Sequence, residues 1–133
     1  MTDSDLVFDT WAWWEYLHQT VAGASLRARF ISGGNFRLHT SSISIGELSA
    51  RLQSDGAVER ISGACGAVRR MSHVWDVTAD IAQEAGPARA RLRESSDSAS
   101  LADAIILVTA QRAGARIVSA DPAFKDVPGI VRR

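Results

Sequence analysis

Short apolar runs with strand character alternate with longer segments of helical periodicity along most of this chain. The runs suited to strands cover residues 6–8, 36–41, 73–77 and 116–119, and a short edge strand is expected at 129–131. Between them, helical spacing of apolar residues covers 11–20, 25–31, 44–54, 58–72, 78–94 and 101–113. This alternation predicts an α/β fold in which a parallel sheet carries helices on both faces.

Length and composition place the chain among globular proteins. Its 133 residues suit one domain, which we expect to span residues 1–133. With 46% apolar and 23% charged residues, the composition argues against disorder. The single cysteine, Cys65, excludes an intramolecular disulfide and the paired-cysteine zinc motifs.

Targeting and charge features restrict the function further. No apolar run approaches the roughly 20 residues of a membrane span, so we expect no membrane association. The acidic start, residues 1–5, lacks the basic character of a signal peptide and favours a cytoplasmic location. Fifteen basic residues balance fifteen acidic ones, so net charge by itself does not indicate a nucleic-acid partner.

Several common catalytic and cofactor motifs are missing from the sequence. There is no GxGxxG after the first strand, no GxxxxGKS/T and no GxSxG. These absences exclude the dinucleotide-binding fingerprint, the P-loop and the nucleophile elbow of hydrolases. His18, His39 and His73 show no metal-ligand spacing, and we expect them to be ordinary surface or partly buried residues.

Four carboxylates stand out by their positions: Asp9, Glu47, Asp103 and Asp121. Asp9 and Asp121 directly follow predicted strands, and Glu47 starts the helix after the second strand. In a parallel sheet these points lie along the carboxyl edge, where open α/β folds place their binding sites. Asp103 begins a helix that returns to the sheet, and it reaches the same edge only if that helix start folds over it.

Each of these acids also has a simple explanation as a cap. Ser44 is expected to cap the helix at 44–54, with Glu47 as its capping-box partner. Ser100 precedes Asp103 by the same three residues. The other two acids could each cap the helix or turn that follows them.

Several ionised carboxylates at one site repel one another unless a cation neutralises them. Mg²⁺ takes oxygen ligands and keeps several waters, and Mn²⁺ accepts the same ligands, whereas zinc is disfavoured without His or Cys. A bound ion of this kind can activate water and stabilise an oxyanion on phosphorus. The expected substrate is therefore a phosphodiester or another phosphate ester.

Four segments resemble, in order, the motifs of the PIN-domain family, and within it the VapC-type toxin ribonucleases of toxin–antitoxin pairs. They are LVFDT at 6–10, SISIGEL at 42–48, SLADAII at 100–106 and IVSADPAF at 117–124. The match spans nearly the whole chain. The resemblance implies a three-layer α/β/α sandwich with a central parallel sheet of four to five strands.

The same resemblance implies a function. It implies an endoribonuclease that depends on Mg²⁺ or Mn²⁺, cuts RNA, forms a homodimer and is inhibited by a cognate antitoxin protein. By motif position, the four acids Asp9, Glu47, Asp103 and Asp121 would hold the metal and carry catalysis. Thr10 and Ser119 would be hydroxyls that orient carboxylates, water or phosphate.

The chain departs from the family pattern at its tryptophans. Trp11, Trp13 and Trp14 are bulkier than the residues usual after the first Asp-Thr pair, and core packing, antitoxin contact and base stacking are all open roles. The further acid after the fourth motif, Asp126, is expected to be solvated. Two alternatives stay open: a PIN-like module that has lost catalysis and binds a partner, or a PIN nuclease of RNA processing.

Overall fold

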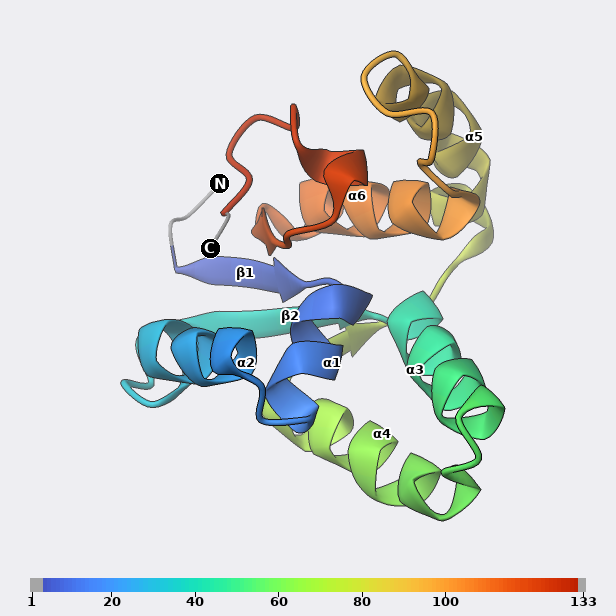
Figure 1. Ribbon diagram of the computed structural model, residues 1–133. Helices are drawn as coiled ribbons and strands as arrows, with labels where there is room; N and C mark the ends of the chain where they lie inside the picture. The colour runs from blue at the N-terminus through green and yellow to red at the C-terminus, as the bar shows by residue number, and fades with distance from the viewer. Residues whose placement is uncertain (1–3, 132–133) are drawn as a thin grey trace.

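The computed structural model describes residues 4–131, so most of the acidic segment 1–5 lies outside it. Figure 1 shows a central sheet with helices on both sides. The strands are β1 (Asp5–Phe8), β2 (Arg37–Ser41), β3 (His73–Trp75) and β4 (Arg116–Val118). The α-helices are α1 (Thr10–Leu17), α2 (Val21–Leu26), α3 (Ser42–Ser54), α4 (Ile61–Met71), α5 (Ala79–Arg93) and α6 (Leu101–Ala113). Three short helical segments complete the elements: Arg27–Ile31, Val58–Arg60 and Pro122–Phe124.

The sheet has the order β3-β2-β1-β4, and its three strand pairs are all parallel. This confirms the predicted parallel sheet. The prediction of an edge strand at 129–131 is wrong, because Val131 forms only an isolated bridge to Val118. Gly129 has a φ of 77°, and the Ile130 amide turns back to the Val127 carbonyl at 3.2 Å, so the backbone there is a turn.

The two faces of the sheet bury two separate clusters of apolar side chains. Val7 of β1 points into the cluster formed with α5 and α6, whereas Leu6 and Phe8 point into the cluster on the other face. Helices α1, α2 and α4 cover that second face (Figure 1). Its centre is Trp13, which is fully buried and packs with its ring centroid 5.0 Å from that of Phe8. The three-layer α/β/α arrangement is therefore confirmed.

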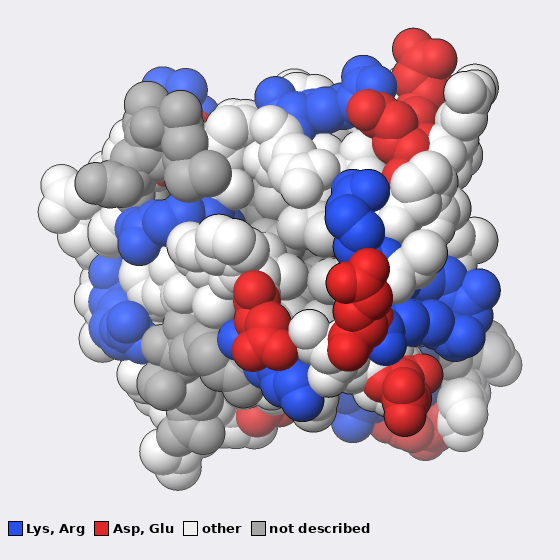
Figure 2. Space-filling model, turned by 90° about the horizontal axis from the view of Figure 1, so that it is seen from above, with Lys and Arg blue, Asp and Glu red and all other residues white. Residues whose placement is uncertain are grey.

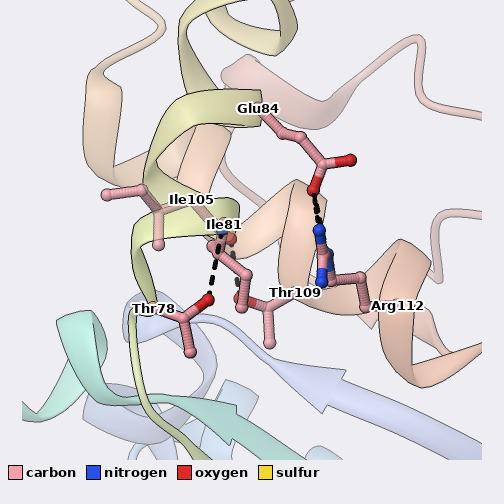
Figure 3. Close-up of polar contacts among 6 residues, drawn as sticks. All are labelled: Thr78, Ile81, Glu84, Ile105, Thr109 and Arg112. Atoms are coloured by element: carbon pink, nitrogen blue, oxygen red, sulfur yellow. Dashed lines mark hydrogen bonds and ion pairs between the residues drawn. The ribbon is translucent and has the colours of Figure 1, made fainter.

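Polar contacts hold α5 and α6 together at their exposed side (Figure 3). The Arg112 guanidinium donates to Glu84 Oε2 from Nε at 2.9 Å and from Nη2 at 2.5 Å. Thr78 begins α5 by accepting the Ile81 amide at 3.2 Å, as the sequence predicts. The predicted bounds of α6 are also confirmed, and Gly114 ends this helix with a φ of 63°. No helix within residues 4–131 is long and apolar enough to cross a membrane.

Two helix boundaries near the N-terminus differ from the prediction. The first helix ends at Leu17 rather than near Thr20, because Thr20 instead caps α2 by accepting the Gly23 amide at 3.0 Å. Gly23, which falls between the two helices expected at 11–20 and 25–31, therefore lies inside α2. A side chain there would overlap the carbonyl of Glu15, so the glycine permits the close approach of α1 and α2.

The start of α3 also differs from the prediction. The structure begins this helix at Ser42, with Ser41 as its N-cap accepting the Ile43 amide at 3.2 Å. The prediction that Ser44 caps the helix with Glu47 as its partner is therefore wrong. Strand β2 runs directly into α3, so the cap falls on the last strand residue rather than on the next serine of the capping pattern. The hydroxyl of Ser44 is thereby free for another role.

A polar network crosses the sheet beneath α6. His39 Nε2 lies 2.8 Å from Asp5 Oδ1, and Trp75 Nε1 donates to His39 Nδ1 at 3.1 Å. These residues belong to β2, β1 and β3. His39 is 7% exposed and thus more deeply buried than expected. The network connects three neighbouring strands, which favours one register for the sheet.

Acidic and basic side chains interleave on the surface above α5 and α6. Figure 2 shows this face from above, with red and blue side chains next to one another and a largely uncharged middle. Neither positive nor negative side chains form a continuous patch on this face. The equal numbers of acids and bases are therefore also mixed in space on this side.

Candidate active site

Asp9 and Asp121 meet at the carboxyl ends of the neighbouring strands β1 and β4. Asp9 caps α1, and its Oδ1 accepts the Ala12 amide at 2.8 Å. Asp121 caps the short helix at Pro122–Phe124, and its Oδ1 accepts the Ala123 amide at 2.9 Å. Ser119 joins the two acids: its hydroxyl donates to Asp9 Oδ2 and accepts the Asp121 amide at 2.9 Å. The Ser119 side chain thus orients one carboxylate and the backbone of the other.

Glu47 comes to the same edge from the second turn of α3. Thr10, the first residue of α1, has its Oγ1 2.5 Å from Glu47 Oε1 and 3.0 Å from the Ser44 hydroxyl. Thr10 and Ser119 therefore both contact carboxylates among the four predicted site acids. Ser44 was not singled out for the site from sequence, although its place three residues before Glu47 puts both on one side of α3.

Asp103 lies in the first turn of α6, and this end of the helix reaches the carboxyl edge. Its Oδ2 accepts the Ser100 amide at 2.9 Å, and the Ser100 hydroxyl accepts the Asp103 amide at 3.0 Å. The capping box suggested by the sequence is therefore present. Each carboxylate oxygen has two lone-pair positions, so the capping contact leaves Asp103 able to bind a ligand.

Burial and mutual repulsion act on the carboxylate of Asp9. The pKa of Asp9 is raised from 3.8 to about 7, mainly because burial removes the hydration of its carboxylate, and the hydrogen bonds from Ser119 and Ala12 oppose this rise. Repulsion from the charges of Asp121 and Asp103 is a smaller part of the same rise. Asp9 is only 3% exposed, so water cannot screen these charges well.

The pKa values of Glu47 and Asp103 are raised as well. Burial is the main cause for both carboxyl groups. The hydrogen bond from Thr10 opposes the shift at Glu47, while the charges of Asp103 and Asp121 add to it. Asp121 also raises the pKa of Asp103. All four predicted acids therefore lie within electrostatic reach of at least one other member of the set.

The donor set suits a hard divalent cation. Its carboxylates and hydroxyls offer only oxygen ligands, which Mg²⁺ and Mn²⁺ accept and which disfavour zinc. Among the residues that the structure describes, none of the four acids forms an ion pair with Lys or Arg. Within this same part of the chain, no group of three or more His, Cys, Asp or Glu side chains is arranged closely enough to hold a metal ion by itself. The chemistry of the donor set, and not a formed coordination shell, therefore points to Mg²⁺ or Mn²⁺, of which Mg²⁺ usually keeps several waters.

The tryptophans after Thr10 have separate surroundings. Trp13 belongs to the core, and its Nε1 donates to Thr40 Oγ1 at 3.0 Å. Trp14 is 8% exposed and packs between two polar groups. The Arg51 guanidinium carbon lies 3.7 Å from its ring centroid, and the His18 ring stacks at 3.9 Å. Trp11 is half-buried, and Asp126 is exposed, as expected.

Comparison with known proteins identifies the family. The model of the PIN domain matches residues 6–130. Mycobacterium tuberculosis VapC20, described as a toxin that cleaves the sarcin–ricin loop, has 22% identity and a TM-score of 0.73, with 96% of this chain and 99% of that chain covered. DNA-bound VapBC from Salmonella typhimurium has 22% identity and a TM-score of 0.72, with coverages of 100% and 98%. VapBC2 from Rickettsia felis, bound to promoter DNA, has 17% identity and a TM-score of 0.71, with 97% of each chain covered.

At these identities the solved structures establish a shared fold, and no curated protein matches the chain by sequence. The family match extends over nearly the whole chain and includes all four carboxylates at the carboxyl edge of the sheet. This protein belongs to the PIN domain family.

Proposed function

We propose that this protein is a metal-dependent endoribonuclease and the toxin of a toxin–antitoxin pair. One observation carries the proposal. Four carboxylates from four separate parts of the chain gather at one sheet edge, and three of them have raised pKa values through burial and mutual repulsion. A cluster of buried carboxylates destabilises the metal-free protein, and a divalent cation removes the repulsion between their charges.

The structural neighbours support the choice of substrate and partner. VapC20 is described as a toxin that cleaves the sarcin–ricin loop, and the other two neighbours are VapBC toxin–antitoxin complexes. We therefore propose RNA as the substrate of this chain and a cognate antitoxin as its protein partner. The proposal also includes a homodimer and one domain over residues 1–133.

Each site residue has a proposed role. Asp9, Glu47, Asp103 and Asp121 would hold Mg²⁺ or Mn²⁺ with their carboxylate oxygens. A bound ion of this type supplies Lewis acidity toward a phosphate ester and a water that is easily deprotonated. Thr10 holds Glu47 and Ser119 holds Asp9, each through a hydroxyl hydrogen bond. These contacts keep the two carboxylates in fixed orientations before substrate binds.

A second feature suits the antitoxin partner. An apolar hollow of about 300 Å³ lies between α1, α3 and α4. Its lining includes Trp14, Leu17, Leu48 and Leu52, and Arg60 stands among them. We propose that an apolar segment of the antitoxin binds here. This gives Trp14 a role in partner contact in addition to its packing.

Cleavage of an RNA pool by purified, antitoxin-free protein tests the proposal. Cleavage is expected with Mg²⁺ or Mn²⁺, no cleavage is expected with EDTA, and Asp103→Asn should be inactive. Asp97→Asn is the matched control, because Asp97 is an exposed carboxylate in the loop before α6. Full activity of Asp103→Asn would refute the site assignment. No cleavage by folded protein under any metal would favour the PIN-like binding module.

A further inference from the structure

Ser44 is a fully buried serine within α3 that is not needed as a helix cap. It has 0% exposure, and the cap of α3 is Ser41, three residues earlier. A buried serine inside a helix usually bonds the carbonyl four residues before it. For Ser44 that residue is Thr40, which belongs to strand β2 and not to the helix. The hydroxyl instead lies 3.0 Å from Thr10 Oγ1.

Thr10 has two neighbours but only one hydroxyl proton. Thr10 Oγ1 is placed to donate either to Glu47 Oε1, at 2.5 Å, or to Ser44 Oγ, at 3.0 Å. A carboxylate can only accept, and a hydrogen bond to it is shorter and stronger than one between neutral hydroxyls. The Thr10 proton therefore goes to Glu47. The lone pairs of Thr10 Oγ1 are then left facing Ser44, whose own proton can satisfy them.

From this geometry we infer that Ser44 is a positioning residue for the proposed metal site. Its hydroxyl donates to Thr10 Oγ1 and thereby keeps the Thr10 proton directed at Glu47. The chain of hydrogen bonds runs from α3 to the start of α1 and back to α3, one turn further on. The inference rests on the proposed function, because it assigns a purpose to the orientation of Glu47.

The burial of Ser44 makes its contribution hard to replace. At 0% exposure, no solvent water takes the place of its hydroxyl when the side chain is shortened. Thr10 then loses a donor, and its hydroxyl is free to rotate away from Glu47. Partners that orient metal ligands in this way typically change metal affinity by about 10–100-fold when removed. Since Ser44 acts one step further out, we expect the lower end of this range.

The test measures Mn²⁺ affinity by calorimetry in a double-mutant cycle. Ser44→Ala should weaken Mn²⁺ binding about tenfold, and Thr10→Val should weaken it at least as much. Adding Ser44→Ala to Thr10→Val should produce no further loss, because Ser44 acts through Thr10. Ser72→Ala is the matched control, since Ser72 also has a hydroxyl bonded to a threonine, Thr40, at 2.7 Å, but it lies at the end of α4.

A second readout does not depend on metal binding or activity. The carbon-13 shift of the Glu47 carboxyl carbon, measured at fixed pH in metal-free protein, should move in Ser44→Ala and stay unchanged in Ser72→Ala. If Ser44→Ala does not fold, Ser44→Cys replaces it, because a thiol of similar size is a weaker donor.

The outcomes separate this inference from the proposed function. Wild-type Mn²⁺ affinity in Ser44→Ala would overturn the inference and leave the proposed function intact. If Ser44→Ala lowers the Mn²⁺ affinity equally in wild type and in Thr10→Val, the inference is also overturned, because Ser44 would then act independently of Thr10. If wild-type protein binds no Mn²⁺, the metal site itself is refuted and Ser44 positions no metal ligand. The Glu47 carbon shift would then report only whether the hydrogen bonds exist.

Discussion

Replacement of Asp9 by Asn should change how the stability of the metal-free protein depends on pH. The Asp9 carboxyl is buried, and its pKa is raised from 3.8 to about 7. Asn has nearly the same shape, is an equally good N-cap and can still accept the Ala12 amide. The substitution therefore removes the ionisable group while keeping the cap.

The direction and the size of the change in stability follow from the raised pKa of Asp9. Between about pH 4 and pH 7 the folded protein holds the Asp9 proton more tightly than the unfolded chain does. The stability that this proton confers is complete below pH 3.8 and is lost as the pH rises through about 7. At about 1.4 kcal/mol for each pKa unit, the loss is about 4 kcal/mol. Asp9→Asn has no carboxyl group at this position and should not lose this stability. The free energy of unfolding of Asp9→Asn relative to wild type should therefore rise by about this amount between pH 4 and pH 8.

Urea unfolding with EDTA present, followed by tryptophan fluorescence from pH 4 to pH 8, measures this difference. Asp97→Asn is the control, because its exposed side chain should give a curve parallel to that of wild type. The Glu47 and Asp103 carboxyls, whose pKa values are also raised, keep part of the pH dependence in every variant. An Asp9→Asn curve that stays parallel to wild type across the whole range would refute the reasoning.

Further expectations concern the metal, the packing and the surface. With Mn²⁺ added at pH 8 to about 100 times its dissociation constant, wild type should gain about 2.7 kcal/mol and Asp9→Asn almost nothing, as thermal unfolding would show. Gly23→Ala should cost about 1–3 kcal/mol in urea unfolding, because its new methyl group overlaps the carbonyl of Glu15. Trp13→Ala should cost about 3–5 kcal/mol by the same assay, because it empties the core beside Phe8. Glu84→Gln, which removes an exposed ion pair, should cost less than about 1 kcal/mol.

The elements with strong local signals were predictable from sequence. Helix α6 has the predicted bounds, since its cap, its continuous apolar run and Gly114 act within a few residues of one another. The serine-rich region around α3 gave a weaker signal. Three serines within four residues, Ser41, Ser42 and Ser44, compete for the cap, and the end of strand β2 decided in favour of Ser41.

The candidate site was partly predictable for a similar reason. The position of an acid after a strand is visible in the sequence, and the direction of a parallel sheet places such acids at one edge. The return of Asp103 to that edge was not visible, because it depends on how α6 packs over the sheet. The contact of Ser44 with Thr10 spans 34 residues, and no local pattern indicates it.

The sequence by itself determined the alternation of strands and helices, the parallel sheet and the four acids near helix starts. These features arise from burial periodicity and from hydrogen bonds between residues close together in the chain. Tertiary structure alone decided that Ser119 contacts Asp9 across 110 residues, and that burial raises the pKa of Asp9 to about 7. Both depend on the packing of whole elements against one another, because only packing removes water from a carboxylate and brings distant side chains within hydrogen-bond distance.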